Sequence, residues 1–290
     1  MTLQEMLKWG EEQLKNAGIA EYNSDAWLLF SFYFQMNRVD FMMNCVNYEE
    51  LSEEQTRQWE SYQEAVAIRK TGKPVQYITN EQNFYGYDFY VDERVLIPRQ
   101  DTEVLIECIE QNMQQVMLTK KKTKLGRLLD MCTGSGCIAI TLANVLEWEE
   151  VVAVDVSAEA LAVAQQNNQQ LGSKVTLLES DLFANVQGEY DVIVSNPPYI
   201  ASSVIDTLSV EVRDYEPRLA LDGTEDGLYF YRRIVEEARK YLKKEGLLFF
   251  EIGYDQAEAV KQLCYDFGYE NVRVVTDLAG LDRVVCAEKR

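Results

Sequence analysis

The chain has no histidine among its 290 residues. Ser-His-Asp and Cys-His catalysis, and metal sites with histidine ligands, are therefore excluded on this chain. No signal-peptide pattern is found at the N-terminus, so a reducing cytoplasmic location is expected. The cysteines lack zinc-type spacing and are expected to be free thiols. They are Cys45, Cys108, Cys132, Cys137, Cys264 and Cys286.

Positive charge is also scarce. Lysine and arginine number 28 against 48 aspartates and glutamates, which gives a formal net charge of −20. A large footprint on duplex DNA needs a basic surface, so direct binding of nucleic acid is not expected. No run reaches about 18 apolar residues, so no membrane span is expected either. The hydrophobic fraction of 47% suffices for the core of one large or two ordinary domains.

Residues 1–73 have the pattern of a small all-helical domain. Apolar residues recur at helical spacing, and the many aromatic residues most simply fill its core. A second helix is expected to be capped by Ser24 or Asp25, and a capping box at residues 52–55 predicts the start of a third. Thr-Gly-Lys-Pro at 71–74 breaks that helix and sets a domain boundary.

Residues 74–98 change to a strand pattern. Val75, Tyr77 and the aromatic residues that follow favour strands, and Gly86 marks a turn, so this segment is predicted to be a β-hairpin linker. Arg99, which comes next, is read as a surface residue in preference to an anchor in a ligand cleft.

Residues 99–290 alternate between strand and helix patterns. The opening helix is expected to be capped by Asp101 or Thr102, and the polar residues 112–124 predict a solvated loop. Strands are expected near residues 127–131, 151–155, 175–179, 191–195, 246–252, 271–276 and 283–287. Helices are expected near residues 136–147, 157–171, 225–244 and 255–267. This alternation implies an α/β fold with a mostly parallel, doubly wound sheet.

The sequence DVIVSNPPYI at 191–200 presents an amide, two prolines and an aromatic ring at a strand end. Pro197 and Pro198 cannot continue a strand ladder. The side-chain carbonyl of Asn196 can accept a hydrogen bond from a planar –NH2 group, the Pro197 carbonyl can accept a second, and Tyr199 can stack on that group. A strand end closed by a Pro-Pro turn is the alternative. A binding site is favoured because residues 196–199 directly follow an apolar strand and because a glycine-containing turn lies upstream, around Gly134.

The glycine-containing turn, CTGSG, follows the first strand of this region and comprises Cys132, Thr133, Gly134, Ser135 and Gly136. The two glycines let the backbone approach a ligand, and the helix N-terminus behind them favours a carboxylate or a phosphate. The third glycine of GxGxxG is missing, so a dinucleotide pyrophosphate fits less well.

Acidic residues end the next two strands. Asp155, 21 residues after Gly134, can accept hydrogen bonds from both hydroxyls of a ribose, although it can also cap the next helix. Asp181 can bond the exocyclic amine of an adenine, with Leu182 against the ring; a simple turn is the alternative. Because three successive strand ends carry suitable groups, a nucleoside site is the preferred interpretation.

In this order, the segments DMCTGSGC, VVAVD, ESDLF and SNPPYI resemble class I S-adenosylmethionine-dependent methyltransferases. The chain more closely resembles the HemK/PrmC family, the peptide-chain-release-factor glutamine methyltransferases. The resemblance covers nearly the whole chain and includes VLIPR, YEPRLAL, FEIG and GLDRV further along. That family methylates the side-chain amide nitrogen, N5, of the glutamine in the Gly-Gly-Gln loop of class 1 release factors.

The resemblance implies S-adenosylmethionine as cofactor and S-adenosylhomocysteine as product. Residues 132–136 would hold its methionine part, Asp155 its ribose and residues 181–182 its adenine. Residues 196–199 would hold the substrate glutamine, with Asn196 also touching the cofactor. The resemblance further implies a seven-stranded Rossmann-like class I methyltransferase domain with a final antiparallel strand, beside an N-terminal substrate-recognition domain.

The chain departs from the family pattern at three positions: Gln100 stands where proline is common, Cys132 where glycine is common, and Leu182 where a larger aromatic is frequent. The expected partner is a class 1 release factor, which would bind the enzyme in the cytoplasm. The enzyme is expected to be a monomer. The alternatives are a glutamine methyltransferase of a ribosomal protein, an adenine-N6 methyltransferase of nucleic acid, and a cofactor-binding scaffold without turnover.

Overall fold

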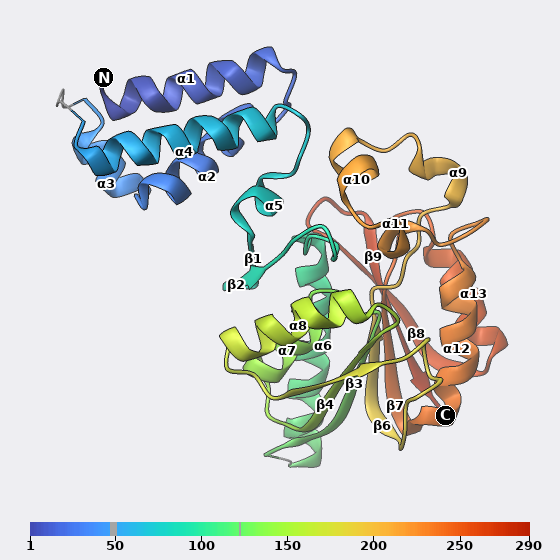
Figure 1. Cartoon of the computed structure of the whole chain (residues 1–290). Coiled ribbons are helices and arrows are strands. Elements are labelled where there is room, and N and C mark those ends of the chain that lie inside the picture. Colours follow the sequence, from blue (N-terminus) through green and yellow to red (C-terminus); the bar gives the residue numbers. More distant parts are fainter. Residues whose placement is uncertain (47–50, 122) are drawn as a thin grey trace. The chain divides into compact units, whose positions relative to one another are not determined.

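The computed structural model describes residues 1–46, 51–121 and 123–290 (Figure 1). The chain forms two compact units. The first comprises Met1–Glu81 together with Ser209–Tyr215, and the second comprises Gln82–Leu208 and Glu216–Arg290. No local pattern around residues 209–215 indicates that this segment belongs to the first unit.

The first unit is all-helical. Its helices are α1 (Leu3–Asn16), α2 (Tyr22–Phe34), α3 (Arg38–Asn44), α4 (Glu53–Arg69), α5 (Val75–Thr79) and α10 (Val210–Tyr215). The predicted capping box of α4 is confirmed, because Ser52 and Gln55 exchange side-chain to backbone hydrogen bonds. Aromatic rings do fill the core, where Phe30 stacks on Phe34 with ring centroids 4.3 Å apart.

Two predictions for this unit are wrong. Helix α2 begins before Ser24 and Asp25, and its N-cap residue makes no side-chain hydrogen bond. The Asp25 carboxylate instead accepts a hydrogen bond from Arg69 at 2.7 Å in the interior. Val75 and Tyr77 lie in α5 and not in a strand, since their side chains are buried on one short helical turn.

Buried charge joins α10 to the rest of the first unit. The side chain of Arg69 is only 2% exposed, and it forms ion pairs with Asp25 of α2 and Glu211 of α10. The hydroxyls of Thr71 and Tyr215 lie 2.8 Å apart. A buried arginine needs such partners, so these contacts hold α10 against the helices that precede it in sequence.

The second unit opens with the predicted hairpin, β1 (Glu81–Phe84) and β2 (Tyr87–Tyr90). Its main sheet has seven strands in the order β5-β4-β3-β6-β7-β9-β8. These are β3 (Leu125–Met131), β4 (Trp148–Asp155), β5 (Val175–Glu179), β6 (Tyr190–Ser195), β7 (Leu242–Glu251), β8 (Tyr269–Thr276) and β9 (Asp282–Lys289). Strand β9 is antiparallel to both its neighbours. The expected Rossmann-like class I fold, with its antiparallel strand, is confirmed.

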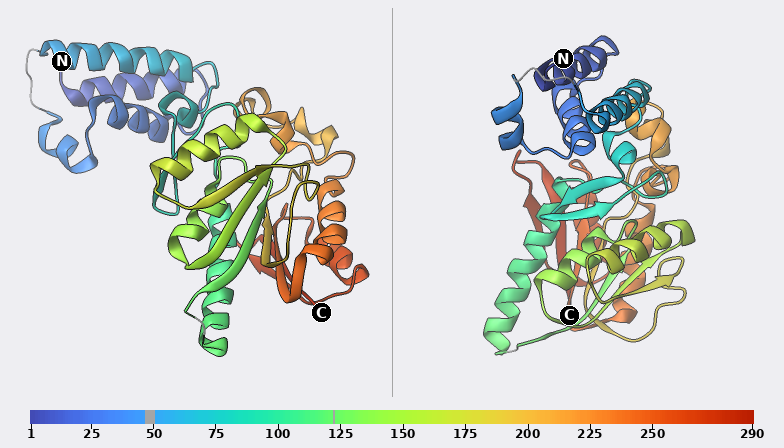
Figure 2. Two further views of the ribbon diagram at one scale, coloured as in Figure 1. Left: turned by 60° about the horizontal axis from the view of Figure 1, so that its bottom comes forward. Right: turned by 60° about the vertical axis from the view of Figure 1, so that its left-hand side comes forward.

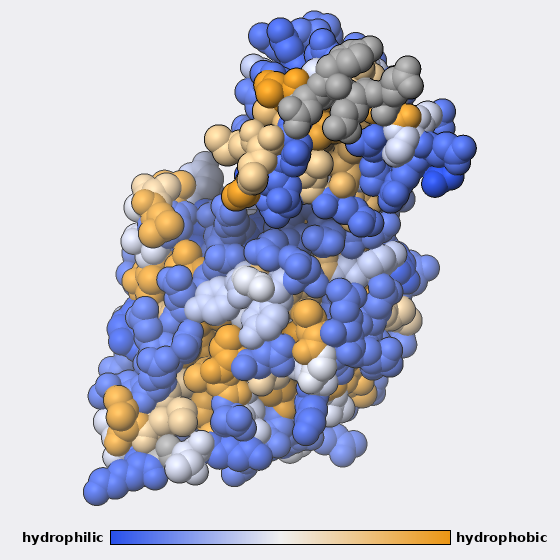
Figure 3. Space-filling model, turned by 90° about the vertical axis from the view of Figure 1, so that its left-hand side faces the viewer, coloured by the Kyte–Doolittle hydropathy of each residue, from blue (hydrophilic) through white to orange (hydrophobic). Residues whose placement is uncertain are grey.

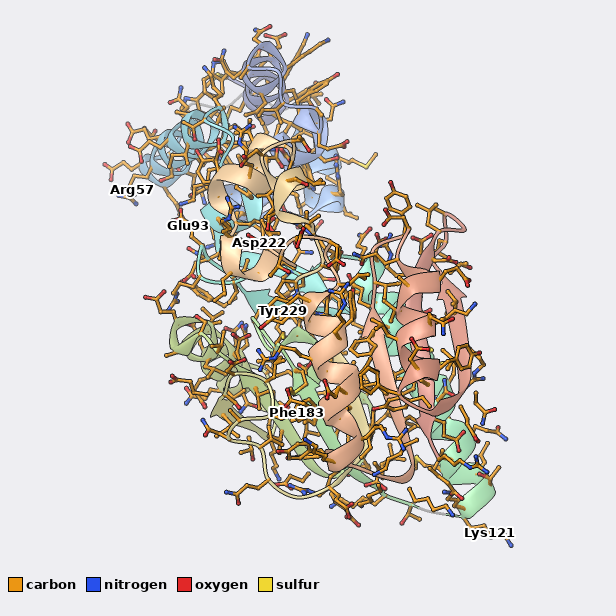
Figure 4. The ribbon with its side chains drawn as sticks, turned by 90° about the vertical axis from the view of Figure 1, so that its right-hand side faces the viewer. Arg57, Glu93, Lys121, Phe183, Asp222 and Tyr229 are labelled. Carbon is orange, nitrogen blue, oxygen red and sulfur yellow. The ribbon has the colours of Figure 1, made fainter. Side chains whose placement is uncertain are left out.

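Helices cover both faces of the sheet (Figures 1 and 2). The second unit contains α6 (Asp101–Lys120), α7 (Cys137–Val145), α8 (Ala158–Gln170), α9 (Ser202–Ile205), α11 (Arg218–Leu221), α12 (Tyr229–Tyr241) and α13 (Ala257–Asp266). One apolar core lies beneath α6 and α7, and the other beneath α12 and α13. Phe183 lies beside α12 and stacks on Tyr241 (Figure 4).

Helix α6 corrects two predictions. It continues to Lys120, so residues 112–120 are helical and not a loop, because Met113 is buried while the polar side chains around it face outward. Asp101 and Thr102 lie within its first turn, and its N-cap residue, Gln100, makes no side-chain hydrogen bond.

The surface of the chain is largely hydrophilic on the face in Figure 3, with apolar residues in separate patches. Across the described ranges, which leave out residues 47–50 and residue 122, every helix is too short or too polar to span a bilayer.

Candidate active site

A cavity of about 410 Å³ opens at the carboxyl ends of β3, β4 and β6 and lies wholly within the second unit. This is where the order of the strands changes direction, because β3 is flanked by β4 on one side and β6 on the other. Nine of the predicted site residues line it: Cys132, Thr133, Gly134, Ser135, Asp155, Asp181, Leu182, Asn196 and Pro198. Gly136, Pro197 and Tyr199 are not among its lining residues.

The turn after β3 forms the floor of the cavity. The Thr133 hydroxyl donates to the buried Asp130 carboxylate at 2.6 Å. Gly134 has φ +55°, and a Cβ built there would meet no atom within 4 Å, so its backbone is open to a ligand. A Cβ at Gly136 would lie 3.2 Å from Ala164 of α8. Gly136 therefore allows the turn to pack closely on that helix.

The carboxylate of Asp155 holds this turn in place. It accepts hydrogen bonds from the backbone N–H groups of Gly134 at 2.8 Å and Ser157 at 2.9 Å. Burial raises its pKa, while these hydrogen bonds act in the opposite direction. Ser157 caps α8 through its own hydroxyl, so Asp155 is free of that task.

Asp181 and Leu182 form the next part of the wall. Asp181 is mostly exposed and pairs with Arg233 of α12 at 2.9 Å. Leu182 adopts φ +48° and is buried, with its carbonyl accepting a hydrogen bond from the Ser180 hydroxyl at 2.6 Å. The side chain of Phe230 also lines the cavity here.

The residues after β6 form the opposite wall. The Ser195 hydroxyl donates to the Met131 carbonyl at 2.8 Å, which joins the ends of β6 and β3. Asn196 and Pro198 face the cavity. The ring of Tyr199 packs against the core beneath α12, and burial raises the pKa of its hydroxyl. Stacking of Tyr199 on a substrate therefore stays a prediction.

Two glycines missed by the sequence analysis make room for this wall. A Cβ on Gly223 would lie 2.8 Å from the Tyr199 Cα, and one on Gly227 would lie 2.3 Å from the Tyr199 carbonyl oxygen. The Gln256 side chain donates to that same carbonyl at 2.9 Å. The sequence signal for this packing is the pair of glycines after the short helix α11. It does not identify their neighbour, because nothing near them in sequence relates them to residue 199.

Arg99 lines the cavity, so its reading as a surface residue is wrong. Its guanidinium pairs at 2.5 Å with Glu216, whose carboxylate is buried. Glu251, at the end of β7, is a second buried acid near this wall. Burial raises the pKa of its carboxyl to about 7. Neither acid was expected to lie at the site.

Comparison with known proteins assigns the whole chain. The PrmC N-terminal domain matches residues 5–79, and the Methyltransferase small domain matches residues 100–212. A release factor glutamine methyltransferase of Clostridium botulinum is 36% identical over 294 residues and covers 100% of both chains. One of Geobacter sulfurreducens is 38% identical, covering 98% of this chain and 95% of its own.

Among solved structures, a Thermus thermophilus 16S rRNA N2 G1207 methyltransferase in complex with AdoMet and guanosine has a TM-score of 0.51. It is 18% identical and covers 72% of this chain and 50% of its own, so it supports the fold alone. The full-length relatives carry the assignment further. The chain belongs to the release factor glutamine methyltransferases, a family of S-adenosylmethionine-dependent enzymes.

Proposed function

We propose that this protein transfers a methyl group from S-adenosylmethionine to the side-chain nitrogen N5 of the glutamine in the Gly-Gly-Gln loop of class 1 release factors. The observation that carries the proposal is Asn196, which lines the cavity beside the turn after β3, in a chain with full-length relatives of this activity. We further propose that residues 1–73 recognise the release factor, and that the protein encounters this substrate in the cytoplasm.

The cavity suits the cofactor in size and in chemistry. Its polar groups are few and set among apolar side chains, as in most sites for small molecules. The open backbone at Gly134 leaves room for the methionine part, and the Asp155 carboxylate beside it can accept from ribose hydroxyls. Leu182 and Phe230 offer apolar surface to a base.

The bound cofactor would supply an electrophilic methyl group on a sulfonium. An amide nitrogen is a poor nucleophile because its lone pair is delocalised. Asn196 Oδ1 and the Pro197 carbonyl, to which none of the described residues donates, would each accept one N–H of the substrate amide. The nitrogen would thereby be aimed at the methyl carbon, so that the C–N bond forms as the S–C bond breaks. The surplus proton on nitrogen then leaves to solvent. This is catalysis by positioning and electrostatics.

The direct test is transfer of radiolabel from S-adenosylmethionine. One reaction contains an intact class 1 release factor, a second contains the factor with only the glutamine of its Gly-Gly-Gln loop replaced, and a third contains duplex DNA. Label on the intact factor alone is expected. Equal label on the replaced factor, or label on the DNA, would overturn the proposal.

A further inference from the structure

Glu251 is a carboxylic acid in a buried position, where a carboxyl lowers the stability of the fold. Its residue is 1% exposed and sits at the end of β7, in the interior of the second unit. Its carboxyl oxygen Oε2 has no hydrogen-bond partner among the residues that the structure describes. An incompletely paired buried carboxyl destabilises a fold, so its presence at the site calls for another reason.

The register of the sheet brings Glu251 beside Asn196. Strands β6 and β7 are parallel, and Ser195 pairs with Phe250, so Asn196 and Glu251 are each one residue beyond this pair. Hydrogen bonding from the side chains of Thr102 and Asn196 lowers the pKa of the Glu251 carboxyl, against the larger effect of burial. The Tyr231 hydroxyl donates to the Glu251 carbonyl at 2.9 Å, which fixes the backbone.

Within the part of the chain that the structure describes, Glu251 forms no ion pair. The positive charge of Arg283 lowers the pKa of Glu251, but the Arg283 guanidinium pairs with Asp101 at 3.1 Å and with Asp277 at 3.0 Å. Thr102 and Asn196 are the neutral donors whose hydrogen bonding lowers the pKa of the Glu251 carboxyl. Thr102 and Asn196 both line the cavity, whereas Glu251 lies behind them.

A carboxyl behind an asparagine decides which way its amide points. A side-chain amide has a donor end and an acceptor end, and its orientation is set by its neighbours. A carboxylate accepts only, so it takes the Asn196 NH2 group and leaves Oδ1 for the cavity. The reverse orientation would set the Asn196 NH2 against the NH2 of a substrate glutamine, donor against donor. We infer that Glu251 is a positioning residue that holds Asn196 with its carbonyl toward the substrate amide.

This inference rests on the proposed function. It is tested by two replacements of nearly equal length. Glu251→Met removes both acceptor oxygens, and we expect kcat to fall roughly 10- to 100-fold, with little change in the KM for either substrate. Glu251→Gln keeps one acceptor oxygen and should recover much of that loss. Neither replacement should unfold the protein. A carboxyl whose pKa is raised in the fold makes the fold less stable as pH rises from the pKa of the unfolded chain through about 7, so the fold does not depend on the charge of Glu251.

A matched control and a double-mutant cycle separate positioning from general damage. Thr141→Val removes a different buried oxygen, a hydroxyl without a hydrogen-bond partner among the described residues, and it should leave kcat unchanged. In an Asn196→Ala background, Glu251→Met should cost nothing further, since it acts through Asn196. Multiplied losses in the double variant, or full activity of Glu251→Met, would overturn the inference.

The pH profile gives a second test. The groups that face this carboxyl are Asp101 of α6, Cys137 of α7, Tyr231 of α12, Arg283 of β9 and Tyr199. Burial raises the pKa of the thiol and of both phenols. Wild-type kcat should therefore rise as Glu251 loses its proton near pH 7. The rise should be clearly smaller in Glu251→Gln, where the Asp130 carboxyl, whose pKa burial also raises to about 7, is left to titrate in this range.

Nuclear magnetic resonance provides a readout without turnover. The side-chain NH2 signals of Asn196, identified by their loss in Asn196→Ala, should shift with a midpoint near pH 7 in the wild type and stay constant in Glu251→Gln. Signals that do not titrate in the wild type would refute the contact. If they titrate but no release factor is methylated, the proposed reaction fails while the placement of Asn196 stands.

Discussion

Asp155 and Asn196 each stand at the carboxyl end of a parallel strand, on opposite walls of one cavity. Asp155 is held by backbone N–H groups of two adjoining turns, at Gly134 and Ser157. Asn196 lies beside Glu251 in the sheet, although the strand of Glu251, β7, begins only at Leu242, far along the chain from β6. The wall proposed to hold the cofactor, with Asp155, is thus built from neighbouring strand–turn–helix units; we call it the cofactor wall. The wall proposed to hold the substrate amide, with Asn196, is built from residues distant in sequence; we call it the amide wall.

This comparison predicts that damage to the two walls will separate binding from turnover. Asn196→Ala should have the largest effect, because it removes an acceptor that acts on the reacting nitrogen. We expect kcat to fall about 100- to 1,000-fold. Cofactor affinity, measured by calorimetry, should change far less. Equal losses in both would contradict the division between the walls.

Asp155→Asn should give the opposite result. The change removes the charge from a carboxylate that accepts two backbone hydrogen bonds and that is expected to accept from the ribose. Losing a charge-assisted hydrogen bond costs about 1.5–3 kcal/mol, or roughly 10- to 100-fold in the Kd of the cofactor. At saturating cofactor, kcat should stay close to that of the wild type; a large fall in kcat with unchanged Kd would show that Asp155 serves the chemistry.

Gly227→Ala tests whether the amide wall depends on close packing. Gly227 has φ +74°, and a Cβ built there would lie 2.3 Å from the Tyr199 carbonyl oxygen, whereas Gly86 has φ +79° in the hairpin turn with no atom within 4 Å of a built Cβ. Gly86→Ala should therefore cost only backbone strain, about 1 kcal/mol in the free energy of unfolding. Gly227→Ala should cost about 1–3 kcal/mol more and lower kcat as well. Similar denaturation midpoints for the two variants would argue against this packing role.

Asp181→Ala should have the smallest effect of the four. The carboxylate is mostly exposed, and its pair with Arg233 is worth at most about 1 kcal/mol. We expect the Kd of the cofactor to rise by about fivefold or less, with kcat unchanged. Arg233→Ala is the matched variant: an equal rise in Kd would show that Asp181 acts through the ion pair and not through contact with the base.

The residues of the cofactor wall could be predicted from the sequence more fully than those of the amide wall. The turn at 132–136, Asp155 and Asn196 were found because each directly follows an apolar strand, and a strand end is a local pattern. Glu251 and Gly227 were not, because their importance lies in the register of β6 against β7 and in the path of a loop. No periodicity within a short window contains that information.

The fold shows the same limit. Strand–helix alternation predicted the mostly parallel sheet, and the resemblance to the family predicted its final antiparallel strand. The end of α6 was missed because polar residues on the outer side of a helix read as a loop, and only the buried Met113 marks the inner side. Residues 209–215 were missed because their partners, Arg69 and Thr71, lie far away in sequence.

The place of α10 in the first unit has a consequence for synthesis. A ribosome makes the N-terminal helices first, and domains generally begin to fold as they emerge. Arg69, however, obtains one of its two carboxylate partners only when Glu211 has been made, after the strands β3 to β6. The first unit to leave the ribosome is therefore not the first to be finished, and its last helix arrives only after the polypeptide has already built the asparagine of its candidate active site.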